Sequence, residues 1–392
     1  MIEKTPFFSW KCGELCDGCK MCVKGQKLVL FVTGICSRNC FYCPLSDTKK
    51  GLDVIYADEW KLKDENDTEA IVEEARLIDA KGAGITGGDP LLKTERVARY
   101  IKLLKENFGK NFHMHLYTLP ESITEERLEM LHKAGLDEIR LHPDFKNDRD
   151  WGKIGIVKKF SWKIGVEIPA IHNLEKETCK MIDFFKDKID FLNINELEMS
   201  DSKASRLAEL GYSTKSDLSY GIKGSEEFAF KLMERYGNNL NIHYCTTKLK
   251  DGVQLAERIK RRANNVKADF DKMTEEGLLI RGAIYFEEIY PGFGYRKKLA
   301  EISENEEKKA FIIKKLKQLK DEVQKSLRIP NNLIKIDNNK LRILTSESIA
   351  RKIASIAPSE KLNKQQGLPI KVAVVTEYPT WDQTEVEMEF LC

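Results

Sequence analysis

Short apolar runs alternate with amphipathic helical segments from residue 27 to about residue 195, and this alternation limits the fold more than any other feature. One helix carries Ile71, Ala75 and Ile78 on one face, and another ends at Gly135, which suits the left-handed position after a helix. Such alternation predicts βαβ units and a parallel sheet. The chain has no Rossmann glycine fingerprint, so six units predict a partial (β/α)6 barrel. The expected strands span residues 28–33, 84–86, 112–117, 138–141, 163–168 and 191–194.

Three cysteines follow the first expected strand directly. Cys36, Cys40 and Cys43 have the spacing C-x3-C-x2-C. Three thiolates so close in sequence can bind three irons of a cubane [4Fe–4S] cluster, which leaves the fourth iron open for a substrate or cofactor. The alternative is a zinc knuckle, which usually needs four ligands in two separated pairs. We expect the three cysteines to be both metal ligands and catalytic residues.

A glycine-rich segment, Gly84-Ile-Thr-Gly-Gly-Asp-Pro90, ends the second expected strand. Glycines let a backbone approach a ligand closely, and the carbonyl groups there can accept hydrogen bonds from an ammonium group. Alone, this segment is an ordinary turn. Because it lies one strand after the cysteine loop, we expect it to bind a ligand.

The N-terminal residues carry four more cysteines, Cys12, Cys16, Cys19 and Cys22. Four thiols in so short a run can hold one cubane, and zinc is the competing metal. Zinc folds usually separate their cysteine pairs more widely, so the spacing favours an auxiliary [4Fe–4S] cluster. Cys245 ends a later strand and is an alternative ligand that could replace one of the four.

Polar residues recur at the ends of the later strands. Ligand sites in α/β barrels lie at the C-terminal ends of the strands, so these residues are candidates for a binding site. The alternative is that some point outward as ordinary polar residues. The candidates are Tyr117, Thr118, Arg140, His142, Glu167, Asn193, Asn195 and Glu196.

The cysteine spacing, with the aromatic Tyr42 before the last cysteine, resembles the radical S-adenosylmethionine (radical SAM) superfamily. The resemblance implies a TIM-like partial barrel in which the open iron is chelated by the methionine part of SAM. It implies that Gly87, Gly88, Asp89 and Pro90 hold the methionine amino group, with Asp89 where the family more often has Glu. Further cofactor contacts implied by position are Tyr42, Thr118, Arg140 (to the methionine carboxylate), His142, Glu167 and Asn195.

By that resemblance, the reduced cluster donates one electron to SAM, and the resulting 5′-deoxyadenosyl radical takes a hydrogen atom from a substrate. Within the superfamily the chain looks like archaeal-type proteins related to pyruvate formate-lyase activating enzyme. The partners implied are a one-electron donor of ferredoxin or flavodoxin type and an unidentified substrate, which could be a protein, an RNA or a small molecule. The alternatives are a tRNA- or RNA-modifying radical SAM enzyme and a non-catalytic iron–sulfur or zinc protein.

Length and charge add the remaining expectations. The 392 residues have a formal net charge of +3, which gives no whole-protein argument for a nucleic-acid partner. The basic stretch 248–262 is typical of a solvated helix face, with phosphate contact as the alternative. No membrane span or signal peptide is evident, so we expect a cytoplasmic, oxygen-poor setting.

We expect three parts along the chain. Residues 1–26 form a cysteine-rich segment, residues 27–272 form the barrel with an extension, and residues 273–392 form an α+β module. The module should have strands at 278–286, 340–344, 370–376 and 384–390, with helices at 306–326 and 346–356.

Overall fold

The computed structural model describes residues 1–356 and 369–391. The chain forms two compact units, Met1–Arg258 and Ile259–Cys392, and their boundary falls inside helix α9 (Ala256–Val266). The cysteine-rich N-terminal residues belong to the first unit. No helix within the described ranges is long and apolar enough to cross a membrane.

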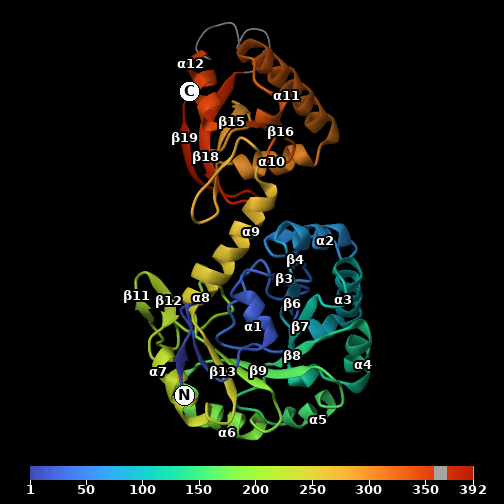
Figure 1. Ribbon diagram of the computed structural model, residues 1–392, viewed down its shortest axis with the longest axis vertical. Coiled ribbons are helices and arrows are strands. Elements are labelled where there is room, and N and C mark those ends of the chain that lie inside the picture. The colour runs from blue at the N-terminus through green and yellow to red at the C-terminus, as the bar shows by residue number, and fades with distance from the viewer. Residues whose placement is uncertain (357–368, 392) are drawn as a thin grey trace. The chain divides into compact units, whose positions relative to one another are not determined.

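The first unit is built on parallel strands that follow one another in chain order around a ring (Figure 1). This order produces a partial TIM-like barrel, and it includes one parallel strand more than the six expected from the 27–195 pattern. The additional strand is β13, which pairs in parallel with β10. The ring strands are β3 (Lys27–Phe31), β6 (Gly82–Thr86), β7 (His113–Thr118), β8 (Glu138–Leu141), β9 (Lys163–Pro169), β10 (Phe191–Asn195) and β13 (Asn241–Cys245).

Helices connect these strands and lie around the outside of the ring (Figure 1). Thr124 caps one of them by accepting a hydrogen bond from the Arg127 amide, and Gly135 ends the same helix with φ of 100°, as expected. Apolar side chains that point outward from the strands, such as Ile139 and Leu141, pack beneath the helices. The helices are α2 (Thr68–Leu77), α3 (Thr94–Phe108), α4 (Glu125–Ala134), α5 (Ile154–Val157), α6 (Glu175–Phe185) and α7 (Ser225–Tyr236).

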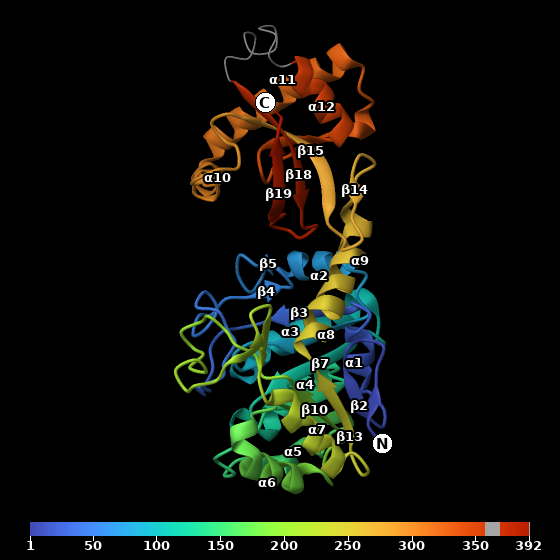
Figure 2. The same ribbon diagram turned by 90° about the vertical axis from the view of Figure 1, so that its left-hand side faces the viewer.

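The N-terminal residues are part of this barrel unit. Strands β1 (Glu3–Lys4) and β2 (Trp10–Cys12) extend the sheet, because β2 pairs antiparallel with β13 (Figure 2). Helix α1 (Asp17–Cys22) then lies within the ring of strands, where the Gly18 amide donates a 3.4 Å hydrogen bond to Glu138 Oε2. The strand pairing and the helix together tie the cysteine-rich residues to the barrel interior.

Shorter elements complete the first unit. At the other end of the sheet, β3 pairs with β4 (Tyr56–Ala57), which pairs with β5 (Trp60–Lys61). Strands β11 (Thr214–Ser216) and β12 (Ser219–Ile222) form a separate hairpin. After β13, helix α8 (Thr247–Leu249) continues as a π-helical turn, η5 (Lys250–Leu255), before α9 begins.

The second unit is an antiparallel sheet packed against helices. Strand β14 (Lys272–Met273) pairs with β15, and the remaining strands follow the order β16-β17-β15-β18-β19. The expected strands and helices of this part occur within one or two residues of their predicted limits, whereas β14, β16 and α10 were not expected. The elements are β15 (Leu279–Phe286), β16 (Ile334–Asp337), β17 (Arg342–Thr345), β18 (Ile370–Glu377), β19 (Glu385–Phe390), α10 (Tyr295–Ser303), α11 (Glu306–Leu327) and α12 (Glu347–Ile356).

Candidate functional site

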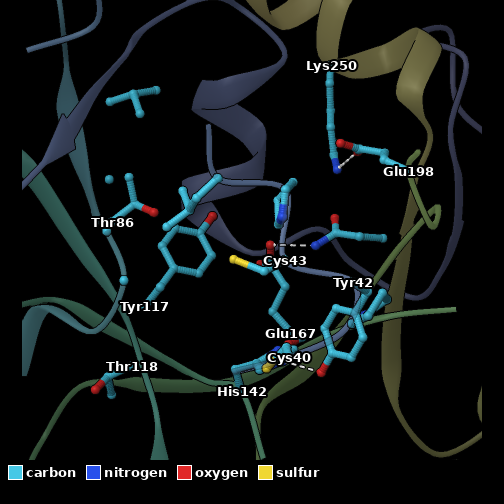
Figure 3. A pocket seen from close by; sticks show the side chains of 18 of the residues that line it. Cys40, Tyr42, Cys43, Thr86, Tyr117, Thr118, His142, Glu167, Glu198 and Lys250 are labelled. Atoms are coloured by element: carbon cyan, nitrogen blue, oxygen red, sulfur yellow. Dashed lines mark hydrogen bonds and ion pairs between the residues drawn. The ribbon is translucent and has the colours of Figure 1, made fainter. Parts of the chain in front are cut away.

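A cavity of about 460 Å³ opens at the C-terminal ends of the ring strands and extends into the barrel (Figure 3). This is the end of a parallel barrel where ligand sites occur. Its lining brings together residues that are far apart in the sequence, from the cysteine loop to the π-helix. The predicted site residues that line it are Cys22, Cys36, Cys40, Tyr42, Cys43, Gly87, Gly88, Tyr117, Thr118, His142, Glu167, Asn195 and Glu196.

The cysteine loop follows β3 and presents Cys36, Cys40 and Cys43 to the cavity. All three thiols are partly buried and free of disulfide bonds. Burial raises the pKa of Cys36 and of Cys40. A metal bound there would favour the thiolate form against this shift, because thiolates are the species that ligate metals. The Lys50 ammonium lies 3.7 Å from Cys43 Sγ and places a positive charge beside the same loop.

Arg38 anchors the cysteine loop to the neighbouring strands. Its Nε donates a 2.8 Å hydrogen bond to Glu121 Oε1, and its Nη1 donates a 3.0 Å bond to the His142 carbonyl. The charged pair is largely buried, with the Arg38 side chain 11% exposed. The loop is therefore held at a fixed place on the barrel rim.

The glycine segment packs directly on the cysteine loop. The Gly88 amide donates to the Thr33 carbonyl at 2.8 Å, and the Asp89 amide donates to the Ile35 carbonyl at 2.8 Å. A Cβ atom on Gly87 or Gly88 would collide with the carbonyl oxygen of Thr33 or Ile35. Glycine is therefore required here by close backbone approach, and both glycines also line the cavity.

Asp89 and Pro90 do not line the cavity, in contrast to the expectation that they hold a ligand amine. Asp89 is fully buried and accepts hydrogen bonds from Thr118 Oγ1, at 2.7 Å, and from Ser122. It also caps the short helix that begins at Pro90. The Asp89 carboxylate thus ties the second strand to the third, and the backbone of Gly87 and Gly88 is the part of this segment that a ligand can reach.

Tyr42 and His142 form a second link between the loop and the barrel (Figure 3). Tyr42 Oη lies 2.9 Å from His142 Nε2, and His142 Nδ1 lies 2.8 Å from the Glu167 carbonyl oxygen. Because a carbonyl only accepts, Nδ1 carries the proton and Nε2 accepts from the tyrosine. Burial lowers the pKa of His142, which keeps the ring neutral in this arrangement.

Arg140 is buried inside the barrel and does not line the cavity. Its Nε donates to Glu138 Oε1 at 2.6 Å, and its Nη1 donates to Glu167 Oε2 at 3.0 Å and to Tyr117 Oη at 2.9 Å. Its Nη2 also lies 3.3 Å from Cys16 Sγ. The guanidinium is therefore fully engaged, which argues against the expected contact with a ligand carboxylate.

Glu167 joins this buried network to the cavity. Burial alone would raise the pKa of Glu167, but Arg140 and the amides of Asn193 and Asn195 outweigh it and hold the pKa below its usual value. The two amides donate to the carboxylate at 2.9 Å each. Glu167 is thus an ionised group with three fixed partners at the cavity wall.

The four N-terminal cysteines have different surroundings. Cys12 Sγ lies 3.9 Å from the Met233 carbonyl on α7, whereas Cys16 and Cys19 both lie beside Arg140. Cys22 lines the cavity, and burial raises its pKa. Cys12 therefore lies in a different environment from Cys16, Cys19 and Cys22.

Several cavity residues were not identified as site residues from the sequence, and Glu198, Lys250 and Gln254 are among them. Lys250 was assigned to a solvated basic face, but in the structure it lies on the π-helix η5 and forms an ion pair with Glu198. No pattern in the sequence distinguishes the π-helix from the α-helix that follows it. The pairing of Glu198 with Lys250 also could not be predicted from the sequence, because the two residues are far apart in the chain.

No three His, Cys, Asp or Glu side chains among the described residues converge on a point where one metal ion could be held. A cubane does not need such convergence, because each cysteine binds a separate iron. The donor set fits the cluster in other respects. Three free thiols line one cavity, and two glycines leave backbone exposed beside them.

Residues 30–169 match the Radical SAM superfamily. A protein of Methanocaldococcus jannaschii, provisionally named a glycyl-radical enzyme activating enzyme, is 44% identical over 311 residues, which cover 77% of this chain and 81% of the relative.

Solved structures with similarity include the radical S-adenosylmethionine methyltransferase TsrM of Kitasatospora setae and methylornithine synthase, PylB. The TsrM structure with cobalamin and a [4Fe–4S] cluster is 14% identical with a TM-score of 0.37, and the match covers 62% of this chain and 54% of that one. The PylB structure is 14% identical with a TM-score of 0.38, and the match covers 58% and 71%. The family match and the 44% identical relative show that this chain belongs to the radical SAM superfamily and is an activase-like enzyme that uses a [4Fe–4S] cluster and S-adenosylmethionine.

Proposed function

We propose that this enzyme removes a hydrogen atom from a glycyl residue of a partner protein, with SAM as its co-substrate. One observation supports the proposal above the others. The cavity that is lined by Cys36, Cys40 and Cys43 is also lined by Gly87 and Gly88, so one cavity offers three metal ligands and an exposed backbone beside them. The glycyl target is supported by the provisional name of the 44% identical relative.

The residues of this chain have separate tasks in the proposal. Cys36, Cys40 and Cys43 would hold the cluster, and the backbone of Gly87 and Gly88 would accept hydrogen bonds from the SAM amine. When bound, the cluster and SAM would supply the one-electron reduction of a sulfonium. They would also supply a radical that takes a hydrogen atom from a C–H bond. Tyr42 and His142 hold the loop in position, and the buried wall at Glu167 keeps that side of the cavity ordered.

The electron has to come from outside the protein. A small one-electron donor of ferredoxin or flavodoxin type is the proposed partner, and an oxygen-poor cytoplasm is the proposed setting. Lys50 beside Cys43 places a positive charge at the loop, which suits an acidic electron donor.

The test is anaerobic reconstitution followed by dithionite and SAM, with 5′-deoxyadenosine as the readout. We expect the wild type to form it and the Cys36→Ala/Cys40→Ala/Cys43→Ala variant to form none above background. Equal yields from both proteins would reject the proposed chemistry. A variant of the exposed surface, Lys133→Gln, controls for handling and should equal the wild type.

An auxiliary cluster at the N-terminal cysteines stays a prediction, and iron content tests it. Two cubanes require about eight irons per chain and one requires about four. We expect Cys16→Ser/Cys19→Ser/Cys22→Ser to lose about half of the iron, while Cys12→Ser keeps it, because Cys12 packs against α7. A similar loss in Cys12→Ser would restore the four-cysteine ligand set predicted from the sequence.

A further inference from the structure

Lys250 and Glu198 form an ion pair on one wall of the cavity (Figure 3). They lie on the side away from Thr86 and Thr118, the last residues of β6 and β7. The two side chains are 29% and 22% exposed, so the pair is partly desolvated. Residues 30–169 match the superfamily, and both members of the pair lie outside that range. The wall therefore lies outside the region that matches the superfamily.

The backbone that presents Lys250 is a π-helical turn. Such turns are rare and occur frequently at functional sites, because the extra residue redirects side chains. Here both Lys250 and Gln254 line the cavity, and Gln254 Nε2 lies 4.0 Å from Cys245 Sγ. The turn thus places an ammonium group and an amide on the same wall.

The pair is held from outside the cavity by the β11–β12 hairpin. Tyr220 of β12 donates a hydrogen bond to Asp251, the residue after Lys250. Glu198 forms a β-bridge with Gly221, and the Met199 amide donates to the Tyr220 carbonyl at 2.7 Å. Both members of the pair are therefore fixed to one hairpin, and their separation is set by the fold rather than by a bound molecule.

The charges on this wall select the kind of group that can bind. Glu167 is already neutralised by Arg140 and by two asparagine amides. Burial opposes the charge on Lys250, but Glu198 outweighs it and holds the pKa of Lys250 above its usual value. Glu198 would repel a carboxylate of a ligand, and Lys250 would repel an ammonium group. An uncharged amide, with its C=O and N–H, can satisfy both without burying a net charge.

We propose that Lys250 and Glu198 are a specificity pair that binds an uncharged amide of the substrate. Lys250 donates to the amide carbonyl oxygen, and Glu198 accepts from the amide N–H. The inference rests on the proposed function, since the peptide unit next to a glycyl Cα–H is such an amide. It assigns substrate binding to two residues outside the matched region.

The test uses the reconstituted full-length enzyme and N-acetylglycine methylamide, the smallest probe with a glycyl Cα between two amides. We expect the probe to increase 5′-deoxyadenosine formation in a saturable way. Lys250→Gln and Glu198→Gln should each raise the half-saturating probe concentration at least tenfold, because each removes a charge-assisted hydrogen bond. Lys248→Gln, an exposed neighbour on the preceding turn, should match the wild type.

The reversed pair Lys250→Glu/Glu198→Lys should recover part of the affinity, since an amide can bind in the opposite orientation. Acetate and methylammonium should bind at least tenfold more weakly than the amide. Unchanged half-saturation in both single variants, or acetate binding as well as the amide, would overturn the inference.

The failure of this inference is distinguishable from the failure of the proposed function. Saturation-transfer NMR of probe binding needs no turnover, so it measures the pair even if no 5′-deoxyadenosine forms. If the wild-type enzyme does not bind the probe in this measurement, the proposed role of the pair is overturned. If the enzyme still cleaves SAM but both single variants bind the probe as the wild type does, the specificity pair is overturned and the proposed function stands.

Discussion

Arg140 in the barrel and Arg342 in the second unit are both buried among carboxylates, and the two arginines differ in what surrounds them. Arg140 in the barrel bonds to Glu138, Glu167 and Tyr117, and two of these partners line the cavity. Arg342 in the second unit bonds to Asp337, Glu377 and Tyr285, and none of these lines the cavity. Similar ion-pair chemistry thus supports a ligand cavity in one unit and a packed sheet in the other.

The burial of the two arginines is nearly equal, at 2% and 0% exposure. Burial therefore does not distinguish a functional site from a structural one. The distinguishing feature is whether a partner of the arginine also faces open space, as Glu167 does. A buried charge that loses its partner costs several kcal/mol in either place.

The largest effect is expected from Arg140→Met. It leaves Glu138 and Glu167 buried without their cation, so the free energy of unfolding of the barrel unit should fall by about 3–5 kcal/mol. The rate of 5′-deoxyadenosine formation per bound iron should fall at least tenfold, because Glu167 loses its position at the cavity wall. Urea denaturation measures the change in stability, and the product assay measures the change in rate. A variant that is as stable as the wild type but inactive would contradict the expected loss of stability and would give the network a purely catalytic role.

Arg342→Met should produce only one of these effects. It leaves Asp337 without its cation and leaves Glu377 paired with Arg281 but not with Arg342, so the free energy of unfolding of the second unit should also fall by about 3–5 kcal/mol. At temperatures where that unit stays folded, 5′-deoxyadenosine formation per bound iron should equal that of the wild type. A tenfold loss of product would break the comparison, because it would give Arg342 a part in catalysis.

A smaller effect is expected in the pH dependence of the free energy of unfolding of the barrel unit. The pKa of Glu167 is lower in the folded protein than in the unfolded chain, so its stabilising contribution is present above the unfolded value near 4.5. That contribution is lost as pH falls through the lowered folded pKa. Glu167→Gln should therefore flatten the decline in the free energy of unfolding of the barrel unit below about pH 4.5, measured by urea titration at several pH values. An unchanged slope would show that Glu167 is not held ionised.

The smallest effect is expected from removing one hydroxyl in each network. Tyr117 accepts from Arg140 at 2.9 Å, and Tyr285 accepts from Arg342 at 3.1 Å. Tyr117→Phe and Tyr285→Phe should each lower the free energy of unfolding of their unit by about 1–3 kcal/mol, because a buried charged donor loses one acceptor. Thermal or urea denaturation measures both, and a difference above that range would show unequal solvent access to the two arginines.

The barrel could be predicted from the sequence because its strands carry local signals. Apolar residues that face the helices recur with strand spacing, and Thr124 and Gly135 mark helix ends through their own side chain or backbone conformation. The limits of the ring strands agree with the structure within two residues. The cysteine loop and glycine segment were equally visible, because their function depends on neighbours in sequence.

The parts that escaped prediction depend on contacts between distant residues. Asp89 was expected to face a ligand, but its carboxylate bonds to Thr118 and Ser122, which only the folded chain brings near. Arg140 was expected to bind a ligand carboxylate, but Glu138 and Glu167 occupy it. The π-helix at Lys250 arises from the way the chain leaves β13, and residue propensities do not specify it.

The pairing of β2 with β13 sets an order of events during synthesis. Cys12 lies beside Ile242 in this pairing, so β2 is synthesised long before β13, the strand with which it pairs. Contacts between such distant segments form late, since closing long loops is entropically costly. Helix α1 and its thiols therefore stay exposed while the ring is being made. Insertion of iron at the N-terminal cysteines would then be possible before the barrel closes, and a truncated chain that ends before β13 would bind metal there but fail to retain it.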